Sequence, residues 1–213
     1  MIIMNALVVR IVEGVPTDVF SDTTVKQLMS GSDARRYGLV KRAIQSGDIV
    51  HLKRGWYALS KRLRRKPVNL YAIAQKIYGP SYVSFESALS HHGWIPEAVY
   101  TVTSACSKRS LEMNTPLGMF SYSHIPSNIF FAGVQRVVSE DDVLFMATPW
   151  RALIDYVYIH KKKWEGTKPL VDNLRIDEDK IKNADFRLLE ELYISTKSKN
   201  VKRFISSIKK ELL

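Results

Sequence analysis

Two kinds of chemistry are compatible with the stretch G-S-D-A-R-R-Y-G at residues 31–38. A Gly-Ser pair at the start of a helix can cradle phosphate in a small nucleotidyltransferase, because the first backbone N–H groups of a helix point at the ligand. The same residues can begin the recognition helix of a DNA-binding helix-turn-helix, with Ser32 as its cap. The surrounding elements have to distinguish these two interpretations.

Nucleotide transfer also requires two carboxylates, one residue apart on the next strand, to hold Mg²⁺. The strand expected after the second helix offers Asp48, but Val50 occupies the partner position. Asp177 and Asp179 have the required spacing but lie far along the chain, at an expected helix start. The sequence therefore disfavours nucleotidyltransferase chemistry.

Other reactive side chains also have structural explanations. His91 and His92 are adjacent on an expected helix, where neighbouring side chains point about 100° apart and cannot share one ion. Cys106, the only cysteine, has basic neighbours that could lower its pKa, but no histidine close in sequence to act as a base. Ser84 and Glu86 resemble helix-capping residues. We therefore predict no catalytic residue, no metal site and no cofactor.

The elements around the opening stretch favour DNA binding. Apolar residues at helical spacing predict a short helix that ends near Gly31, and the Ser32 hydroxyl can accept a backbone N–H of the next helix. That second helix should end at Gly47. Residues 48–60 have the pattern of a two-stranded hairpin with a basic turn at 53–55. Two helices followed by a hairpin predict a winged helix-turn-helix.

The second helix has an apolar side, which we expect to face the core, formed by Leu39, Val40, Ala43 and Ile44. Gly38 in mid-helix costs about 1 kcal/mol relative to Ala, so either DNA approaches the backbone closely there or the helix is irregular. Polar and basic residues of this helix, the hairpin turn and the segment that follows are expected to bind DNA: Ser32, Arg35, Arg36, Lys41, Arg42, Gln45, Lys53, Arg54, Lys61, Arg62, Arg64 and Arg65.

Charge is concentrated in the same region. The chain of 213 residues has a formal net charge of +11, and between residues 33 and 66 the only acids are Asp33 and Asp48, against eleven lysines and arginines. Such a basic segment is typical of a surface that binds a polyanion, usually nucleic acid. A solvated basic face with a cationic linker is the alternative.

The block K-R-L-R-R-K-P at 61–67 marks a domain boundary, because Pro67 interrupts a helix and the sign of the charge changes beyond it. We predict a winged helix-turn-helix domain over residues 1–66 and a mixed α/β domain over residues 67–213, so that the fold class is α+β. The second domain should contain a mostly antiparallel sheet and a helix that starts at Pro149. Its helical tail, from about residue 168, has five apolar side chains for packing: Leu188, Leu189, Leu192, Ile205 and Ile208.

A single cysteine excludes a disulfide framework and favours a reduced, cytoplasmic setting. The apolar stretch at residues 1–14 has no basic n-region and no small-residue cleavage site, and it is too short to span a bilayer. We therefore expect it to form a core helix or strand of the first domain, with no association with a membrane.

Four stretches together resemble the abortive-infection AbiEi family of antitoxin-regulators: G-W-Y-A-L-S at 55–60, S-Y-V-S-F-E-S-A-L-S-H-H-G-W-I-P at 81–96, Y-T-V-T-S at 100–104 and A-T-P-W-R-A-L-I-D at 147–155. The resemblance covers roughly residues 18–165, and the run at 81–96 is its most specific part. It implies a bacterial or mobile-element protein with an N-terminal winged helix and a C-terminal antitoxin domain.

The resemblance further implies a transcriptional autorepressor that binds double-stranded DNA at its own operator, where inverted repeats are expected. It also implies an antitoxin that neutralises a co-encoded nucleotidyltransferase toxin, in type IV systems without a stable complex with that toxin. The family motifs mark the fold better than a catalytic site. The residues of the recognition helix vary with the operator in this family, so none is carried over by identity. An RNA-binding or RNA-modifying module with a basic N-terminal face is the alternative, since a basic face does not distinguish DNA from RNA.

Overall fold

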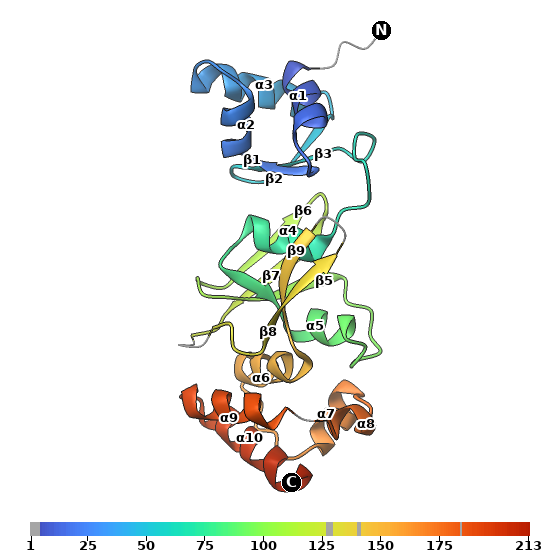
Figure 1. Ribbon diagram of the computed structural model, residues 1–213, viewed down its shortest axis with the longest axis vertical. Coiled ribbons are helices and arrows are strands. Elements are labelled where there is room, and N and C mark those ends of the chain that lie inside the picture. The colour runs from blue at the N-terminus through green and yellow to red at the C-terminus, as the bar shows by residue number, and fades with distance from the viewer. Residues whose placement is uncertain (1–4, 127–129, 140–141, 184) are drawn as a thin grey trace. The chain divides into compact units, whose positions relative to one another are not determined.

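The computed structural model describes residues 5–126, 130–139, 142–183 and 185–213, and it is an α+β protein (Figure 1). The chain divides into two compact units. Unit 1 comprises Met1–Ile73 with Asn114–Leu117, and unit 2 comprises Ala74–Met113 with Gly118–Leu213. The division falls inside a helix, a few residues beyond the boundary expected at Pro67.

Unit 1 combines three helices with a small antiparallel sheet of strand order β1-β3-β2 (Figure 1). Its elements are α1 (Ala6–Gly14), β1 (Val19–Ser21), α2 (Asp22–Leu28), α3 (Asp33–Gln45), β2 (Ile49–Lys53) and β3 (Trp56–Leu59). The predicted pair of helices and the hairpin that follows them are confirmed. Strand β1, which pairs with β3, was not predicted, because three residues are too few to show an alternating pattern.

The core of unit 1 lies where α1, α3 and the sheet meet. Leu7, Val8 and Ile11 of α1 are fully buried, and they pack in one cluster with side chains such as Val40 of α3 and Leu59 of β3. Positions 7, 8 and 11 follow one face of a helix, which explains why this apolar stretch is helical. The expectation of a core element near the N-terminus is confirmed for residues 6–14.

Local capping sets the ends of α2 and α3. Ser21 and Thr24 form a capping box at the start of α2. The Ser32 hydroxyl accepts the backbone N–H of Arg35 at 3.3 Å, as predicted for the start of α3. The helix ends at Gln45, and Gly47 follows with φ of +72°, a conformation that favours glycine.

Unit 2 is built on a mixed six-stranded sheet of strand order β6-β7-β5-β4-β9-β8. Its elements up to the central helix are α4 (Leu70–Ile77), β4 (Ser81–Val83), α5 (Phe85–His91), β5 (Thr101–Cys106), β6 (Leu111–Thr115), β7 (Gly118–His124), β8 (Val134–Ser139), β9 (Asp142–Ala147) and α6 (Pro149–Ile159). Helix α4 begins within unit 1 and ends within unit 2. The helix predicted from Pro149 is confirmed, with Thr148 as its cap.

The expectation of a mostly antiparallel sheet is wrong. Strand β4 pairs antiparallel with β5 but parallel with β9, and β5 pairs parallel with β7, while β8 and β9 are antiparallel. Alternation of apolar and polar residues reports which face of a strand is buried. It carries no information on the direction of the neighbouring strand.

The helical tail is confirmed and begins at Lys168. It comprises α7 (Lys168–Leu174), α8 (Glu178–Ile181), α9 (Phe186–Ser195) and α10 (Lys199–Leu212). All five side chains that were expected to pack are buried. Helices α9 and α10 contact each other and α6, so that α6 lies between them and the sheet (Figure 1). Throughout the described part of the chain, no helix combines the length and the apolar character needed to cross a membrane.

Candidate nucleic-acid interface

One side of α3 packs into unit 1 and the other side is open to solvent. Val40 is 5% exposed and Ala43 is fully buried. Four of the predicted nucleic-acid-binding side chains lie on the exposed side: Arg35, Lys41, Arg42 and Gln45. The helix therefore presents three positive charges and one amide away from the core of unit 1.

Gly38 lies in the middle of this exposed side. A Cβ atom at Gly38 would lie 3.5 Å from Nη1 of Arg42, so the Arg42 guanidinium lies across the helix surface where a side chain is absent. The helix continues from Asp33 to Gln45 without interruption at this glycine. Of the two explanations offered for Gly38, an irregular helix is therefore wrong, and a close approach of DNA stays a prediction.

Ile44 corrects the predicted packing of α3. It was expected in the core, but it is 37% exposed. The buried side of the helix is centred further round, because Arg36, and not Ile44, shares it with Ala43. Seven positions separate Arg36 and Ala43, so they point in nearly the same direction. The sequence-based prediction assumed that every arginine of α3 faces solvent. That assumption displaces the expected core side of the helix towards Ile44.

Arg36 connects α3 to the turn that precedes it. Its side chain is 18% exposed, and Nη1 donates to the carbonyl oxygens of Met29, at 3.3 Å, and Gly31. Its Nη2 donates to the Asp33 carboxylate at 2.6 Å, and this bond lowers the pKa of Asp33, with a further contribution from Lys26. Arg36 thus stabilises the four-residue connection between α2 and α3, in contrast to the exposed arginines.

The turn between β2 and β3 consists of Arg54 and Gly55 and lies against the start of α2. The Asp22 N–H donates to the Gly55 carbonyl at 3.0 Å. Gly55 has φ of +79°, and a Cβ atom there would lie 3.1 Å from the Asp22 carboxylate. Arg54 is exposed and Lys53 is half-buried. The predicted wing is therefore a short turn fixed at its base, and Arg54 is its exposed cation.

A cavity of about 510 Å³ lies between α2, α3 and this hairpin. Apolar parts of its lining come from Val25, Tyr37, Val40 and Tyr57, and Arg54 lies at the hairpin side. Burial, together with a hydrogen bond to Asp22, raises the pKa of Tyr57 to about 12. The cavity adjoins the side of α3 on which Tyr37 lies.

The basic block at 61–66 follows the surface of unit 1. Arg62 forms an ion pair with the Asp48 carboxylate, whose side chain is 7% exposed. Arg65 donates to the Asp18 carboxylate at 3.1 Å and to the Val15 carbonyl at 2.6 Å. Arg64 donates to the Leu59 carbonyl at 2.8 Å, and Lys61 is exposed. These three arginines hold the segment against unit 1, although the side chains of Arg62 and Arg65 remain 54% and 43% exposed.

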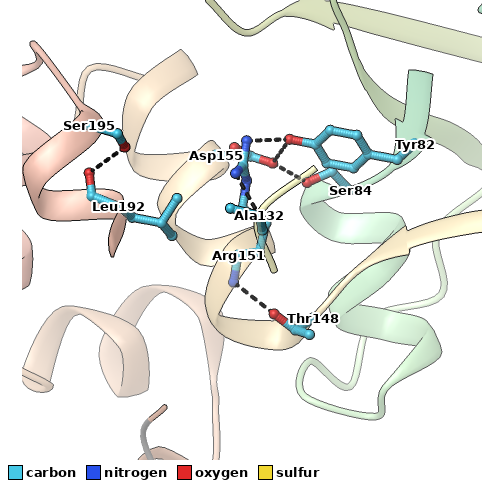
Figure 2. Close-up of polar contacts among 8 residues, drawn as sticks. All are labelled: Tyr82, Ser84, Ala132, Thr148, Arg151, Asp155, Leu192 and Ser195. Atoms are coloured by element: carbon cyan, nitrogen blue, oxygen red, sulfur yellow. Dashed lines mark hydrogen bonds and ion pairs between the residues drawn. The ribbon is translucent and has the colours of Figure 1, made fainter. Parts of the chain in front are cut away.

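Unit 2 contains a buried charge network that the sequence analysis missed (Figure 2). Arg151 and Asp155, one helical turn apart on α6, have side chains only 2% and 3% exposed, and Nε of Arg151 donates to Asp155 at 3.0 Å. Arg151 also donates to the Ala132 carbonyl at 2.9 Å and to the Tyr82 hydroxyl at 2.6 Å. The sequence signal that could have predicted this network is an Arg-x-x-x-Asp pair in an otherwise apolar helix. Charged side chains are rarely buried without a partner, so two opposite charges one turn apart on a buried helix indicate an ion pair.

The Asp155 carboxylate is the centre of this network. Besides Arg151, it accepts hydrogen bonds from the Tyr82 hydroxyl and the Ser84 hydroxyl, both at 2.8 Å. Ser84 is the N-cap residue of α5, as expected, but its hydroxyl makes no cap bond and donates to Asp155 instead. Although burial opposes its charge, Arg151 has its pKa raised by Asp155 and Tyr82, and it remains a cation. The network joins β4 to α6.

The remaining reactive groups of unit 2 have structural surroundings. Nε2 of His92 lies 2.9 Å from the Ala147 carbonyl, and burial lowers the pKa of His92. Burial also raises the pKa of the Cys106 thiol, despite the nearby Lys108. No group of three or more His, Cys, Asp or Glu side chains suited to a metal ion occurs among the residues that the structure describes.

Comparison of the chain with protein-family models and with curated proteins finds no match in either case.

Proposed function

We propose that unit 1 binds double-stranded DNA through the exposed side of α3, with the β2–β3 turn beside it, and that the chain represses its own operon. The element order α1-β1-α2-α3-β2-β3 and the sheet order β1-β3-β2 support a winged helix-turn-helix. The four-residue connection between α2 and α3 is of the length typical of this motif. Its setting would then be the cytoplasm, where DNA and a reduced cysteine occur together.

One observation carries the proposal most directly. Arg35, Lys41, Arg42 and Gln45 share the exposed side of a helix whose opposite side is fixed in the core by Val40 and Ala43. Arginine donates two hydrogen bonds to guanine. Glutamine can donate one hydrogen bond to N7 of adenine and accept one from its N6 amino group, while lysine suits phosphate equally well. A rigid helix with this set of side chains is suited to base recognition.

The same geometry favours DNA over RNA. The major groove of B-form DNA is about 12 Å wide and admits an α-helix, whereas the major groove of A-form RNA is deep and too narrow for side chains to read. RNA binding remains the second candidate, supported by the basic charge of unit 1 alone.

An antitoxin role for unit 2 is proposed from the resemblance to the AbiEi family. Two of the stretches that carry the resemblance meet in the network of Figure 2, since Tyr82 and Ser84 come from one and Arg151 and Asp155 from the other. This supports a role of the motif residues in the fold. Co-expression with the product of the adjacent gene tests the role. We expect that product to be a nucleotidyltransferase that arrests growth and this chain to rescue growth; continued growth arrest would contradict the role.

DNA binding is tested by fluorescence anisotropy with the duplex that precedes the coding sequence and with a structured RNA of equal length. We expect the full chain to bind the duplex more tightly. Arg35→Ala and Arg42→Ala should each weaken that binding, while Arg187→Ala, which removes an exposed arginine of α9 in unit 2, should leave it unchanged. Equal affinity for the RNA, or equal effects of all three substitutions, would contradict the proposal.

A further inference from the structure

The two large apolar side chains that residues 5–73 expose both lie on α3. Tyr37 is 70% exposed and Ile44 is 37% exposed. They are seven positions apart, so they point in nearly the same direction, one above the other along the helix. Lys41 is exposed between them. A narrow apolar stripe therefore runs beside the basic side chains of this helix.

The stripe borders the cavity of unit 1. Tyr37 lines that cavity together with Val25, Val40 and Tyr57. On its other side, the stripe adjoins the exposed Lys41 and Gln45. Towards the hairpin its surroundings are mixed, because charged and polar side chains such as Asp22, His51 and Arg54 also line the cavity. Towards the face proposed to contact DNA they are cationic. The partner that suits such a stripe has an apolar group at the surface of a polyanion.

We infer that Tyr37 and Ile44 contact the C5-methyl groups of thymines in the major groove, which makes them specificity-determining residues. The inference rests on the proposed DNA binding. Among the edges that base pairs present in the major groove, thymine carries the apolar group, whereas the other bases offer hydrogen-bond donors and acceptors there. The positive charge of Arg35, Lys41 and Arg42 favours DNA over an apolar protein surface as the occupant, because a protein partner would have to bury Lys41 within an apolar contact.

The spacing of the stripe predicts the spacing of the thymines. Seven residues along an α-helix correspond to about 10.5 Å at a rise of about 1.5 Å per residue. Successive base pairs rise by about 3.4 Å. The two thymines should therefore lie about three base pairs apart, on either side of the pair nearest to Lys41.

The test removes only methyl groups from the DNA. Duplexes enriched from a random pool by the full chain are resynthesised with uracil in place of thymine, one position at a time. Because each buried methyl group contributes about 0.8 kcal/mol, we expect a loss of about fourfold in affinity at each of two positions, about three base pairs apart, and little change elsewhere.

Substitutions then connect each methyl group with a side chain. Tyr37→Ala should abolish the effect of uracil at one position, and Ile44→Ala at the other. Tyr37→Phe should retain it, because the ring and not the hydroxyl makes the contact. Tyr100→Ala is the matched control, since Tyr100 is an exposed tyrosine of unit 2 (89% exposed), and it should leave both effects intact.

The outcomes separate this inference from the proposed function. Tight duplex binding that is insensitive to uracil, or an enriched sequence without thymine, overturns the inference and leaves DNA binding in place. Failure to bind any duplex overturns both. If Tyr37→Ala and Ile44→Ala leave DNA binding and its uracil effects unchanged, the thymine contacts belong to other residues.

Discussion

The buried network of unit 2 allows a stability prediction whose size follows from the structure. In Asp155→Asn the side chain keeps its shape but loses the charge that faces Arg151. The guanidinium, whose side chain is 2% exposed, then has no counter-ion. One amide N–H₂ group also replaces an oxygen that accepts hydrogen bonds, where the Tyr82 and Ser84 hydroxyls donate.

Breaking a buried ion pair by removing one partner costs about 3–5 kcal/mol, because it leaves an uncompensated buried charge. For a chain of this length, that loss corresponds to a decrease in Tm of roughly 6–20 °C. Urea unfolding followed by tryptophan fluorescence measures the change, and Trp150 lies next to Arg151 as a local reporter. The midpoint in urea should fall in proportion.

Asp179→Asn is the matched control, since Asp179 pairs with Lys182 at 2.7 Å on the surface of the same unit. It should leave the unfolding curve nearly unchanged, because exposed ion pairs contribute little. The double substitution Arg151→Met with Asp155→Leu should recover part of the lost stability, since apolar pairs can replace buried ion pairs. An Asp155→Asn effect no larger than that of Asp179→Asn would refute the reasoning.

Three further predictions concern DNA recognition and pH. Arg35→Ala and Arg42→Ala should each cost about 1–3 kcal/mol and relax preference at a single base pair; sequence selection with each variant checks this, and an unchanged preference would restrict both residues to phosphate contacts. Arg54→Ala should weaken binding to selected and random duplexes by similar factors, because a phosphate contact does not depend on sequence. A loss confined to the selected duplex would contradict a phosphate contact by Arg54. Because burial lowers the pKa of His92 in the folded chain, the unfolded chain takes up the proton first. The stability from neutral His92 is therefore complete above about pH 6.5 and decreases as the pH falls towards the folded pKa; urea unfolding between pH 7 and pH 5 should show a smaller decrease for His92→Gln, and an equal decrease would exclude this contribution.

The helix ends of unit 1 were predictable because their causes are local. The Ser32 hydroxyl caps the start of α3 by accepting an N–H three residues away. Gly47 follows the end of the helix because its backbone adopts a positive φ. The packing of the helical tail followed from apolar spacing for the same reason.

The features that the sequence analysis missed depend on partners far along the chain. Arg65 finds Asp18 across 47 positions, and Asp155 finds Tyr82 across 73. Because of such pairings, the basic block at 61–66 lies against unit 1, although its sequence resembles a cationic linker. Arg36 was missed for a different reason. Its partners Met29, Gly31 and Asp33 lie within seven positions, but the burial of an arginine on the core side of α3 is not predicted by residue type.

The placement of the basic residues limits the number of phosphates that unit 1 can neutralise. Arg36, Arg62, Arg64 and Arg65 have partners within unit 1. Arg62 and Arg65 remain 54% and 43% exposed but are held by carboxylates. The exposed cations of α3, the turn and the following segment outside these contacts include Arg35, Lys41, Arg42, Arg54 and Lys61. About five phosphate contacts are therefore expected.

The salt dependence of duplex binding tests the central claim, which is that the exposed side of α3 binds DNA. With about five contacts, log K against log salt concentration should have a slope of about −4.5 for the full chain. The double variant Arg35→Gln with Arg42→Gln should reduce the slope to about −2.7, because two of the five positive charges that displace counterions are lost, including where these side chains contact base edges. A slope near zero, or the same slope for the variant and the unaltered chain, would contradict this assignment.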